Sequence, residues 1–402
     1  MAAEWKEIPF SEAVLLNPTT PLKRGGVYPF VDMQAIAPNT RGVRCSEHRE
    51  FTGGGSRFQN QDTLMARITP CLENGKIARF LAPDGESVGH GSTEFIVVRG
   101  RPSVTDNDYA YYLTISPEVR NFAISQMTGS SGRQRVPTDS LGNINVLLPP
   151  LAEQKTIAGI LSALDDKIEL NLRKNETLEA LAQSLFKSWF VDATQYALPK
   201  GWRYAAIAEL CDINAWMLNK GDELDRIEYV EISEVSRGNI ASIQVFPRGE
   251  EPSRARRRLR HGDTVLSTVR PERGSYFLCL NPPPNLIAST GFAVVTPTKA
   301  PWSFIHAALT HPEVSEHLGQ QADGGAYPAV HPDIIGKWEV PWPNKPEKVE
   351  QFHRACAPLY ERAEHNRRES RTLAALRDAL LPKLLSGELR VPATKCKLEA
   401  GA

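Results

Sequence analysis

The sequence has no net charge and no long hydrophobic run, and each absence excludes a class of protein. Lys+Arg and Asp+Glu both total 47, so the chain lacks the overall positive field of strongly basic nucleic-acid-binding proteins. Hydrophobic residues make up 41% and charged residues 23%, as is typical of globular proteins. No segment approaches the roughly 18 uninterrupted apolar residues of a membrane span, and MAAEWKEIPF at the N-terminus is too polar for a signal peptide. We therefore expect a cytoplasmic protein with no membrane association.

The cysteines and histidines are too scattered to indicate a metal site or a disulfide framework. No CxxC pair is present, and the nine histidines show no ligand spacing. We expect no metal, and a reducing cytoplasm is compatible with this cysteine usage. The six cysteines are Cys45, Cys71, Cys211, Cys279, Cys356 and Cys396.

Motifs of catalysis are incomplete. LNPPPN (280–285) is similar to the Asn-Pro-Pro-aromatic tetrapeptide of adenine methyltransferases, but Pro284 replaces the aromatic ring that stacks on a flipped base. A GxxxxGK[ST] phosphate loop is missing, and HPDIIGKWEVP (331–341) lacks the acid-x-Lys that would complete a nuclease metal site. We predict no catalytic residue and no cofactor bound by this chain.

The chain does contain an internal repeat, which must be considered before any other organisation. Four segments of the first half return in the same order about two hundred positions later, with similar apolar and turn residues. The matched segments are QDTLMARITP (61–70) with GDTVLSTVRP (262–271), STEFIVV (92–98) with STGFAVV (289–295), SPEV (116–119) with HPEV (311–314), and GSSGRQRVPTD (129–139) with DGGAYPAVHPD (323–333).

Each half reads as alternating apolar strands and glycine or proline turns, followed by a short helical stretch near 109–126 or 302–321. Each half then closes with one long helix. We predict an α/β (α+β) fold with two globular domains separated by two long antiparallel helices. The expected boundaries are 1–148 for the first domain, 149–191 for the central helix, 192–344 for the second domain, 345–388 for the C-terminal helix and 389–402 for a flexible tail.

The two helices carry the heptad spacing of a coiled coil. Steps of four and three from Ile157 and from Phe352 meet mainly apolar residues, with Arg377 as the exception. Pro358 should kink the second helix or delay its start. The predicted seam is Ile157, Leu161, Leu164, Ile168, Asn171, Asn175, Leu178 and Leu185 in the first helix, and Phe352, Leu359, Asn366, Leu373 and Leu380 in the second.

Polar residues interrupt both seams at equivalent places, Asn171 and Asn175 in one helix and Asn366 and Ser370 in the other. We hypothesise that they face each other and hold the register of an antiparallel pair, since an Asn slipped against Leu would leave buried donors unpaired at a cost of about 1–3 kcal/mol. The alternative is that these side chains face solvent or another subunit.

Helices of this length would measure about 50–60 Å at about 1.5 Å per residue. We expect the paired helices to act as a spacer between two similar heads. Such a molecule suits a target with two half-sites, because one turn of duplex DNA measures about 34–36 Å. Since the heads differ in sequence, the half-sites should differ too.

The segment PPLAEQKTIAGILSALDDKIELNLRKNETLEALAQSLFKSWFVD (149–192) resembles the central conserved region of type I restriction-modification specificity (S) subunits, and RITPCLENGK (67–76) resembles a turn of their target-recognition domains. The second half has RPERGS (270–275) where the first has TPCLENGK. The resemblance implies a non-catalytic subunit that reads a bipartite, asymmetric DNA target and recruits two methyltransferase (M) subunits and restriction (R) subunits. It places S-adenosylmethionine, ATP and Mg in those partners.

Candidate DNA contacts lie in glycine-containing loops and in one basic run. Arg, Lys, Asn, Gln and Glu side chains bond base edges or phosphates, and glycine permits close approach. Ordinary hairpin turns and a solvated loop face remain the alternatives. The candidates are Arg67, Glu73, Asn74, Lys76, Arg133, Gln134 and Arg135 in the first half, and Arg254, Arg256, Arg257, Arg258, Arg270, Glu272, Arg273 and Tyr327 in the second.

Two other functions stay open from the sequence. A self-sufficient DNA methyltransferase would need the cofactor and aromatic motifs that are missing. A transcriptional repressor of asymmetric operators would be expected to carry a helix-turn-helix, which the sequence does not show.

Overall fold

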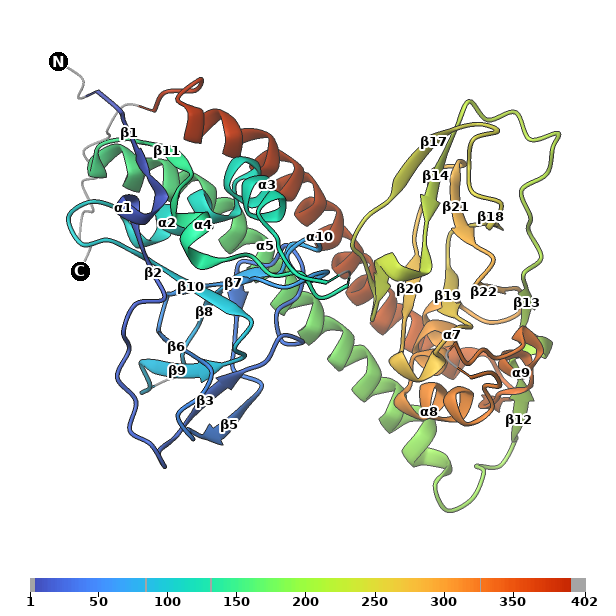
Figure 1. Cartoon of the computed structure of the whole chain (residues 1–402). Coiled ribbons are helices and arrows are strands. Elements are labelled where there is room, and N and C mark those ends of the chain that lie inside the picture. The colour runs from blue at the N-terminus through green and yellow to red at the C-terminus, as the bar shows by residue number, and fades with distance from the viewer. Residues whose placement is uncertain (1–3, 84, 131, 326, 392–402) are drawn as a thin grey trace, which may run out of the picture. The chain divides into compact units, whose positions relative to one another are not determined.

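A computed structural model describes residues 4–83, 85–130, 132–325 and 327–391 of the chain (Figure 1). The chain divides into two compact units. Unit 1 contains Met1–Glu169 and Ser370–Ala402, and unit 2 contains Leu170–Glu369. The division crosses both long helices, so each unit holds part of each helix. The predicted tail of 389–402 falls mostly outside the described residues.

Unit 1 combines two β-sheets, a two-stranded ribbon and four short helices. The strand orders are β2-β10-β7-β8-β4, β5-β3-β9-β6 and β1-β11. The strands are β1 (Lys6–Pro9), β2 (Val14–Leu16), β3 (Val27–Val31), β4 (Gly42–Val43), β5 (Glu47–Glu50), β6 (Ser56–Gln59), β7 (Thr63–Ala66), β8 (Ile77–Phe80), β9 (Val88–Gly91), β10 (Phe95–Gly100) and β11 (Asn145–Leu148). The helices are α1 (Phe10–Ala13), α2 (Asn107–Ile115), α3 (Pro117–Ser125) and α4 (Thr138–Gly142).

Unit 2 has a similar arrangement, without a counterpart of β4 among its described residues and with an additional ribbon, β15-β16. Its strand orders are β13-β22-β19-β20, β17-β14-β21-β18, β12-β23 and β15-β16. The strands are β12 (Trp202–Ala206), β13 (Cys211–Ile213), β14 (Arg226–Val230), β15 (Val235–Ser236), β16 (Asn239–Ile240), β17 (Gln244–Pro247), β18 (Ala255–Arg258), β19 (Asp263–Ser267), β20 (Tyr276–Cys279), β21 (Leu286–Ser289), β22 (Phe292–Pro297) and β23 (Glu339–Pro343). The helices are α6 (Ile207–Leu210), α7 (Trp302–Leu309), α8 (Pro312–Gln320) and α9 (Pro332–Lys337), with short 3-10 turns at Ile232–Glu234 and Pro271–Arg273.

The internal repeat is confirmed by the topology. β3 pairs with β9 in parallel, and β14 pairs with β21 in parallel, while the other sheet pairs of unit 2 and most of those in unit 1 are antiparallel. Asn17 and Asn214 end equivalent strands with positive φ values of 46° and 56°. Their side-chain oxygens accept hydrogen bonds from the backbone N–H of Val97 and Val294, both at 2.9 Å. The same local sequence therefore forms the same strand end twice.

The central strands of the sheet that contains β7 are buried on both faces because this sheet has a different neighbour on each side. In unit 1, Leu64 of β7 belongs to a core between the two sheets, whereas Met65 packs with the helices. All four residues of β7 and of β8 are buried. This explains the continuous apolar runs that the repeat displays. Each unit is thus an α/β structure with helices on one face of a sheet and a second sheet on the other.

The long helices are α5 (Leu151–Phe186), with 36 residues, and α10 (Glu347–Ser386), with 40 residues. α5 continues through a π-helical turn at Lys187–Val191 and a 3-10 turn at Asp192–Thr194. α10 runs through Pro358 without interruption, so the expectation of a late start is wrong. Pro358 is exposed, and its ring therefore meets solvent rather than packed side chains.

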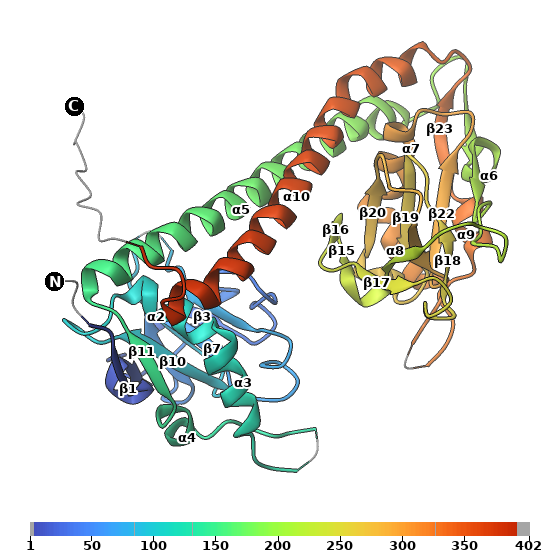
Figure 2. The same cartoon turned by 90° about the horizontal axis from the view of Figure 1, so that it is seen from above.

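α5 and α10 lie side by side and antiparallel within each unit (Figure 2). In unit 1, Asp165 pairs with Arg377 and Glu153 with Arg390. In unit 2, Asn175 pairs with Asn366. Numbers rise along one helix as they fall along the other, as expected for antiparallel packing. The predicted seam residues Ile157, Leu161, Asn171, Asn175, Phe352 and Asn366 are buried, and Leu164, Ile168, Leu178, Leu185, Leu359, Leu373 and Leu380 are half-buried.

The three asparagines of the seam face the neighbouring helix rather than solvent, and Ser370 is half-buried. Asn366 Nδ2 donates to Asn175 Oδ1 at 2.8 Å, and Asn175 Nδ2 donates to the carbonyl oxygen of Ala363 at 3.1 Å. Asn171 Nδ2 donates to Glu369 Oε2 at 2.8 Å and to the Asn366 carbonyl oxygen at 3.3 Å. The side-chain pair is therefore Asn175 with Asn366, and Asn171 contacts backbone and carboxylate groups instead.

Arg377, the exception in the predicted seam, is buried. Its Nη1 lies 2.6 Å from Asp165 Oδ1, and the other oxygen of Asp165 accepts a 2.7 Å hydrogen bond from the Tyr112 hydroxyl. Neighbouring Leu376 is 46% exposed, so it does not replace Arg377 in the seam. The seam tolerates an arginine because α5 supplies the matching carboxylate.

None of the described helices combines the length and apolar character needed to cross a bilayer. Five cysteines are free thiols in the described part of the chain, and Cys396 lies outside it. Groups of three or more His, Cys, Asp or Glu side chains placed to hold a metal ion are not found in the residues that the structure describes.

Candidate nucleic-acid interface

The two loops predicted to contact DNA in the first half meet in unit 1. One is the turn 67–76 after β7, and the other is the loop 128–136 after α3. An isolated antiparallel bridge joins Ile68 to Arg135. The backbone N–H of Thr69 donates to the Gln134 carbonyl oxygen at 3.0 Å, and the backbone N–H of Val136 donates to the Arg67 carbonyl oxygen at 2.8 Å. Loops about sixty positions apart in sequence therefore form one surface.

The equivalent loops meet in the same way in unit 2. Val269 forms a bridge with Ala329. The backbone N–H of Arg270 donates to the Pro328 carbonyl oxygen at 2.8 Å, and the backbone N–H of Val330 donates to the Thr268 carbonyl oxygen at 2.9 Å. Each unit thus presents one pair of joined loops, and the two pairs carry different side chains.

In the unit 1 turn, backbone geometry separates exposed side chains from structural ones. Gly75 has a φ of 73°, and a Cβ there would lie 2.7 Å from Asn39 Oδ1, so glycine is required. Lys76 Nζ donates to the Met33 carbonyl oxygen at 2.8 Å and helps to hold the turn. Glu73 and Asn74 are exposed at its tip, where their side chains are available to a ligand.

In the neighbouring loop, Arg133 is exposed and Gln134 is half-buried. Arg135 is engaged by Glu94, with its Nε at 2.9 Å and 3.0 Å from the two carboxylate oxygens and its Nη2 at 2.7 Å from Oε1. This carboxylate raises the pKa of Arg135. Arg133 is therefore the arginine of this loop whose side chain is offered outward, whereas Arg135 would have to exchange Glu94 for a phosphate.

The unit 2 loops offer a stacked pair. The Arg270 guanidinium lies over the Tyr327 ring, 4.7 Å from its centroid, and Tyr327 is 73% exposed. Arg270 has a left-handed φ of 49°, a conformation disfavoured for residues with a Cβ. Glu272 and Arg273 are exposed on the following 3-10 turn. Arg270 is half-buried, and a guanidinium on an exposed aromatic ring presents both a planar donor and a stacking surface.

The basic run 254–260 lies largely on β18, at the edge of a sheet. Acidic neighbours occupy two of its members, because Arg258 pairs with Asp222 at 2.8 Å and Arg256 lies 3.5 Å from Glu251. Arg257 is half-buried, and burial lowers its pKa. Arg254 is exposed and has no ion pair among the described residues. The run is therefore less cationic in the fold than in the sequence.

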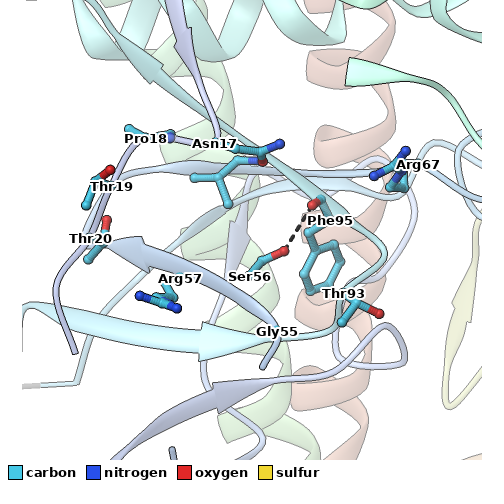
Figure 3. Close-up of a pocket in the computed structure, with 11 residues that line it drawn as sticks. Asn17, Pro18, Thr19, Thr20, Gly55, Ser56, Arg57, Arg67, Thr93 and Phe95 are labelled. Atoms are coloured by element: carbon cyan, nitrogen blue, oxygen red, sulfur yellow. Dashed lines mark hydrogen bonds between the residues drawn. The ribbon is translucent and has the colours of Figure 1, made fainter. Parts of the chain in front are cut away.

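A cavity of about 380 Å³ opens in unit 1 beside the joined loops (Figure 3). Arg67, at the start of the turn 67–76, is one of the residues that line it. The others are Asn17, Pro18, Thr19, Thr20, Gly55, Ser56, Arg57, Thr93, Phe95 and Val97.

Sequence reasoning missed the acidic partners and the cavity. Glu94 lies inside the repeated STEFIVV segment, where the second copy has Gly291. The comparison of the two copies therefore showed that the first half has a carboxylate at a position where the second half has none. Asp222 precedes Arg258 by more than thirty positions and gave no local signal. Trp216, whose ring lies 3.0 Å from the Arg260 guanidinium carbon, stands where the first copy has Thr19.

Comparisons with known proteins agree on one family. Residues 16–180 match the family described as "Type I restriction modification DNA specificity domain". The chain is 25% identical to the type I restriction enzyme HindI specificity subunit of Haemophilus influenzae, over 87% of this chain and 92% of that protein. It is 34% identical to the type I restriction enzyme EcoEI specificity subunit of Escherichia coli, over 40% of this chain and 27% of that protein.

A solved structure has a similar fold. The type I restriction-modification S subunit from M. genitalium matches with a TM-score of 0.54 and 16% identity, covering 95% of this chain and 96% of that one. At this identity the match concerns the fold alone. It spans nearly the whole length of both chains.

Proposed function

We propose that the chain is a member of the type I restriction-modification DNA specificity family, which its residues 16–180 match, and that it selects the DNA sequence on which a type I complex acts. Each unit reads one half of a bipartite, asymmetric target through its joined loops. The paired helices α5 and α10 set the separation between the half-sites.

The observation that carries this proposal is the duplicated loop pair with unlike side chains. Both units hold their loops together by equivalent backbone bonds, so both offer a ligand a surface built in the same way. Unit 1 places Asn74 and Arg133 there, and unit 2 places Arg270 and Tyr327. Two similarly built surfaces with different hydrogen-bonding groups suit two half-sites of different sequence.

We assign catalysis to partner subunits, and propose that the complex contains two methyltransferase subunits and restriction subunits in the cytoplasm. In this proposal the chain binds no cofactor of its own. S-adenosylmethionine, ATP and Mg belong to the partners. The incomplete Asn-Pro-Pro motif at 281–283 supports this division, because Pro284 offers no ring for a flipped base.

A methyl-transfer assay tests the proposal. The purified chain is mixed with duplex DNA and labelled S-adenosylmethionine, with and without its methyltransferase partner. We expect transfer only when the partner is added, and only at a bipartite sequence. Transfer by the chain alone would favour a self-sufficient methyltransferase, and tight binding to an asymmetric operator with no effect on a methyltransferase partner would favour a repressor.

A further inference from the structure

The unit 1 cavity is lined by donors and cations, without a carboxylate among its lining residues. Arg57 and Arg67 supply two guanidinium groups on different sides of it (Figure 3). Thr19, Thr20 and Thr93 add hydroxyl groups. Such a lining favours a ligand that accepts hydrogen bonds and carries negative charge.

Several of the polar groups around the cavity are already held in place. Ser56 Oγ donates to the Phe95 carbonyl oxygen at 3.0 Å, and Asn17 is fixed by its bond from Val97. Thr20 Oγ1 accepts from Arg99 Nη2 at 2.9 Å, so its own hydrogen remains available to donate. Gly55 has a φ of 85°, and a Cβ there would lie 2.3 Å from the Gly91 carbonyl oxygen. The wall is therefore preorganised.

Arg67 makes fewer contacts than the other arginines that are buried or half-buried in unit 1. Arg101 and Arg120 also have an unpaired Nε, but their guanidinium groups donate to the carbonyl oxygens of Ser11 and Glu73, both at 2.7 Å. Arg99 pairs with Asp62, Arg79 with Asp108 and Arg41 with Asp166. The Arg67 side chain has no hydrogen bond or ion pair among the described residues, and its Nε is buried without a partner. A buried donor left unpaired costs about 1–3 kcal/mol, so the site is incomplete without an acceptor.

Unit 2 closes the equivalent position with its own side chains. The repeat places Thr268 at the position of Arg67, Met217 at that of Thr20 and Arg257 at that of Ser56. Arg257 Nη1 lies 3.1 Å from Met217 Sδ, and Thr268 Oγ1 donates to the Gly291 carbonyl oxygen at 2.8 Å. Long side chains thus touch where unit 1 has short hydroxyl residues around a cavity.

We propose that the unit 1 cavity is a binding site for the phosphate group of a nucleotide, with Arg67 as its main charged partner and Thr20 as a hydroxyl donor. The volume of about 380 Å³ leaves room for a sugar attached to the phosphate. The phosphate belongs either to the DNA backbone or to a free nucleotide. The first possibility rests on the proposed function, and the second is independent of it.

Isothermal titration of the full chain with inorganic phosphate and with adenosine 5′-monophosphate, at constant ionic strength, tests the free-nucleotide source. Salt titrations of binding to a 30-base-pair duplex test the DNA source. The variants are Arg67→Thr and Thr20→Met, each of which introduces the residue found at the equivalent place in unit 2. Arg203→Gln is the matched control, since Arg203 is an exposed arginine of unit 2 paired with Glu209.

For a free nucleotide we expect saturable binding that Arg67→Thr weakens by about 10-fold or more and that Arg203→Gln leaves unchanged. For a DNA phosphate we expect Arg67→Thr to reduce the salt dependence of DNA binding by about 0.9 in log–log slope. The proposal is overturned if the unmodified chain binds neither small ligand and Arg67→Thr binds DNA with the parental slope. A chain that binds phosphate but does not distinguish DNA sequences would instead contradict the proposed function.

Discussion

Asp62 and Asp263 occupy equivalent positions in the two units but meet different partners. Both are fully buried and accept the backbone N–H of a residue three positions earlier. Asp62 also receives two 2.7 Å hydrogen bonds from Arg99. The second copy has Thr296 at the position of Arg99, and burial raises the pKa of Asp263 to about 6. A single exchange therefore converts an ion pair into a group that resists ionisation.

This difference predicts a pH dependence of unit 2. The pKa of Asp263 is higher in the fold than its ordinary value of 3.8, so the folded state holds more protons between about pH 4 and 6. The free energy of unfolding should then fall as the pH rises through this window, by up to about 3 kcal/mol. Asp263→Asn should remove this part of the slope.

Tryptophan fluorescence during urea unfolding at several pH values measures the free energy of unfolding of unit 2, because every tryptophan except Trp5 lies in that unit. The control is Asp62→Asn, which leaves the half-buried Arg99 without its carboxylate and should destabilise unit 1 by about 3 kcal/mol. An unchanged slope in Asp263→Asn would show that Asp263 titrates normally.

At the scale of the element, the register of α5 against α10 depends on a few buried polar pairs. Asn175 and Asn366 pair in unit 2, and Asp165 and Arg377 pair in unit 1. Leucine contacts alone permit a helix to slip by one heptad with little loss, whereas a slip separates these pairs.

Asn366→Leu should destabilise unit 2 by about 1–3 kcal/mol, because it leaves the buried Asn175 side chain without its donor. The double variant with Asn175→Leu should cost less than the sum of the single changes, since it replaces the pair by an apolar layer. Urea unfolding of the parent chain, the two single variants and the double variant gives the coupling free energy between the two asparagines. Additive costs would mean that the two amides act independently.

Arg377→Met should destabilise unit 1 by about 3–5 kcal/mol, because Asp165 then stays buried and, among the described residues, keeps Tyr112 as its one side-chain donor. Adding Asp165→Leu should restore much of the loss. Hydrogen exchange of the backbone amides in the unit 1 parts of the long helices, residues 151–169 of α5 and 370–386 of α10, follows unit 1 directly. Equal stability of Arg377→Met and the parent chain would contradict a structural role for the pair.

At the scale of the whole molecule, the two loop pairs make separate predictions about sequence preference. Arg133 lies on the loop after α3 in the loop pair of unit 1, and Arg270 lies on the turn after β19 in the loop pair of unit 2. If they contact bases, Arg133→Gln should change the preferred sequence of one half-site and Arg270→Gln that of the other, each with discrimination lower by about 1–3 kcal/mol. Mapping of methylated adenines in cells that carry the partner subunits reads both half-sites at once.

A uniform loss of binding across all sequences would assign these arginines to phosphates instead. Arg203→Gln serves again as the control, because it removes one exposed charge of unit 2 away from the loops.

The sequence by itself determined the repeat and the two long helices, and it showed the resemblance to one family. These features depend on local order along the chain: a heptad spacing, strand-length apolar runs and turns that recur about two hundred positions apart. Their place in the seam favoured burial of Asn171, Asn175 and Asn366 over exposure to solvent, and the structure confirms that they are buried. Periodicity reports which face of an element is covered, and it does so without knowledge of the neighbour.

Only the tertiary structure decided which charges are free to act. Arg135 faces Glu94, Arg258 faces Asp222 and Arg377 faces Asp165, although nothing near each arginine in the sequence indicates its partner. The unpaired Nε of Arg67 and the cavity beside it are likewise products of packing. Ion pairs and cavities depend on distances in space between segments far apart in the chain, and the spacing of residue types along one segment carries no record of those distances.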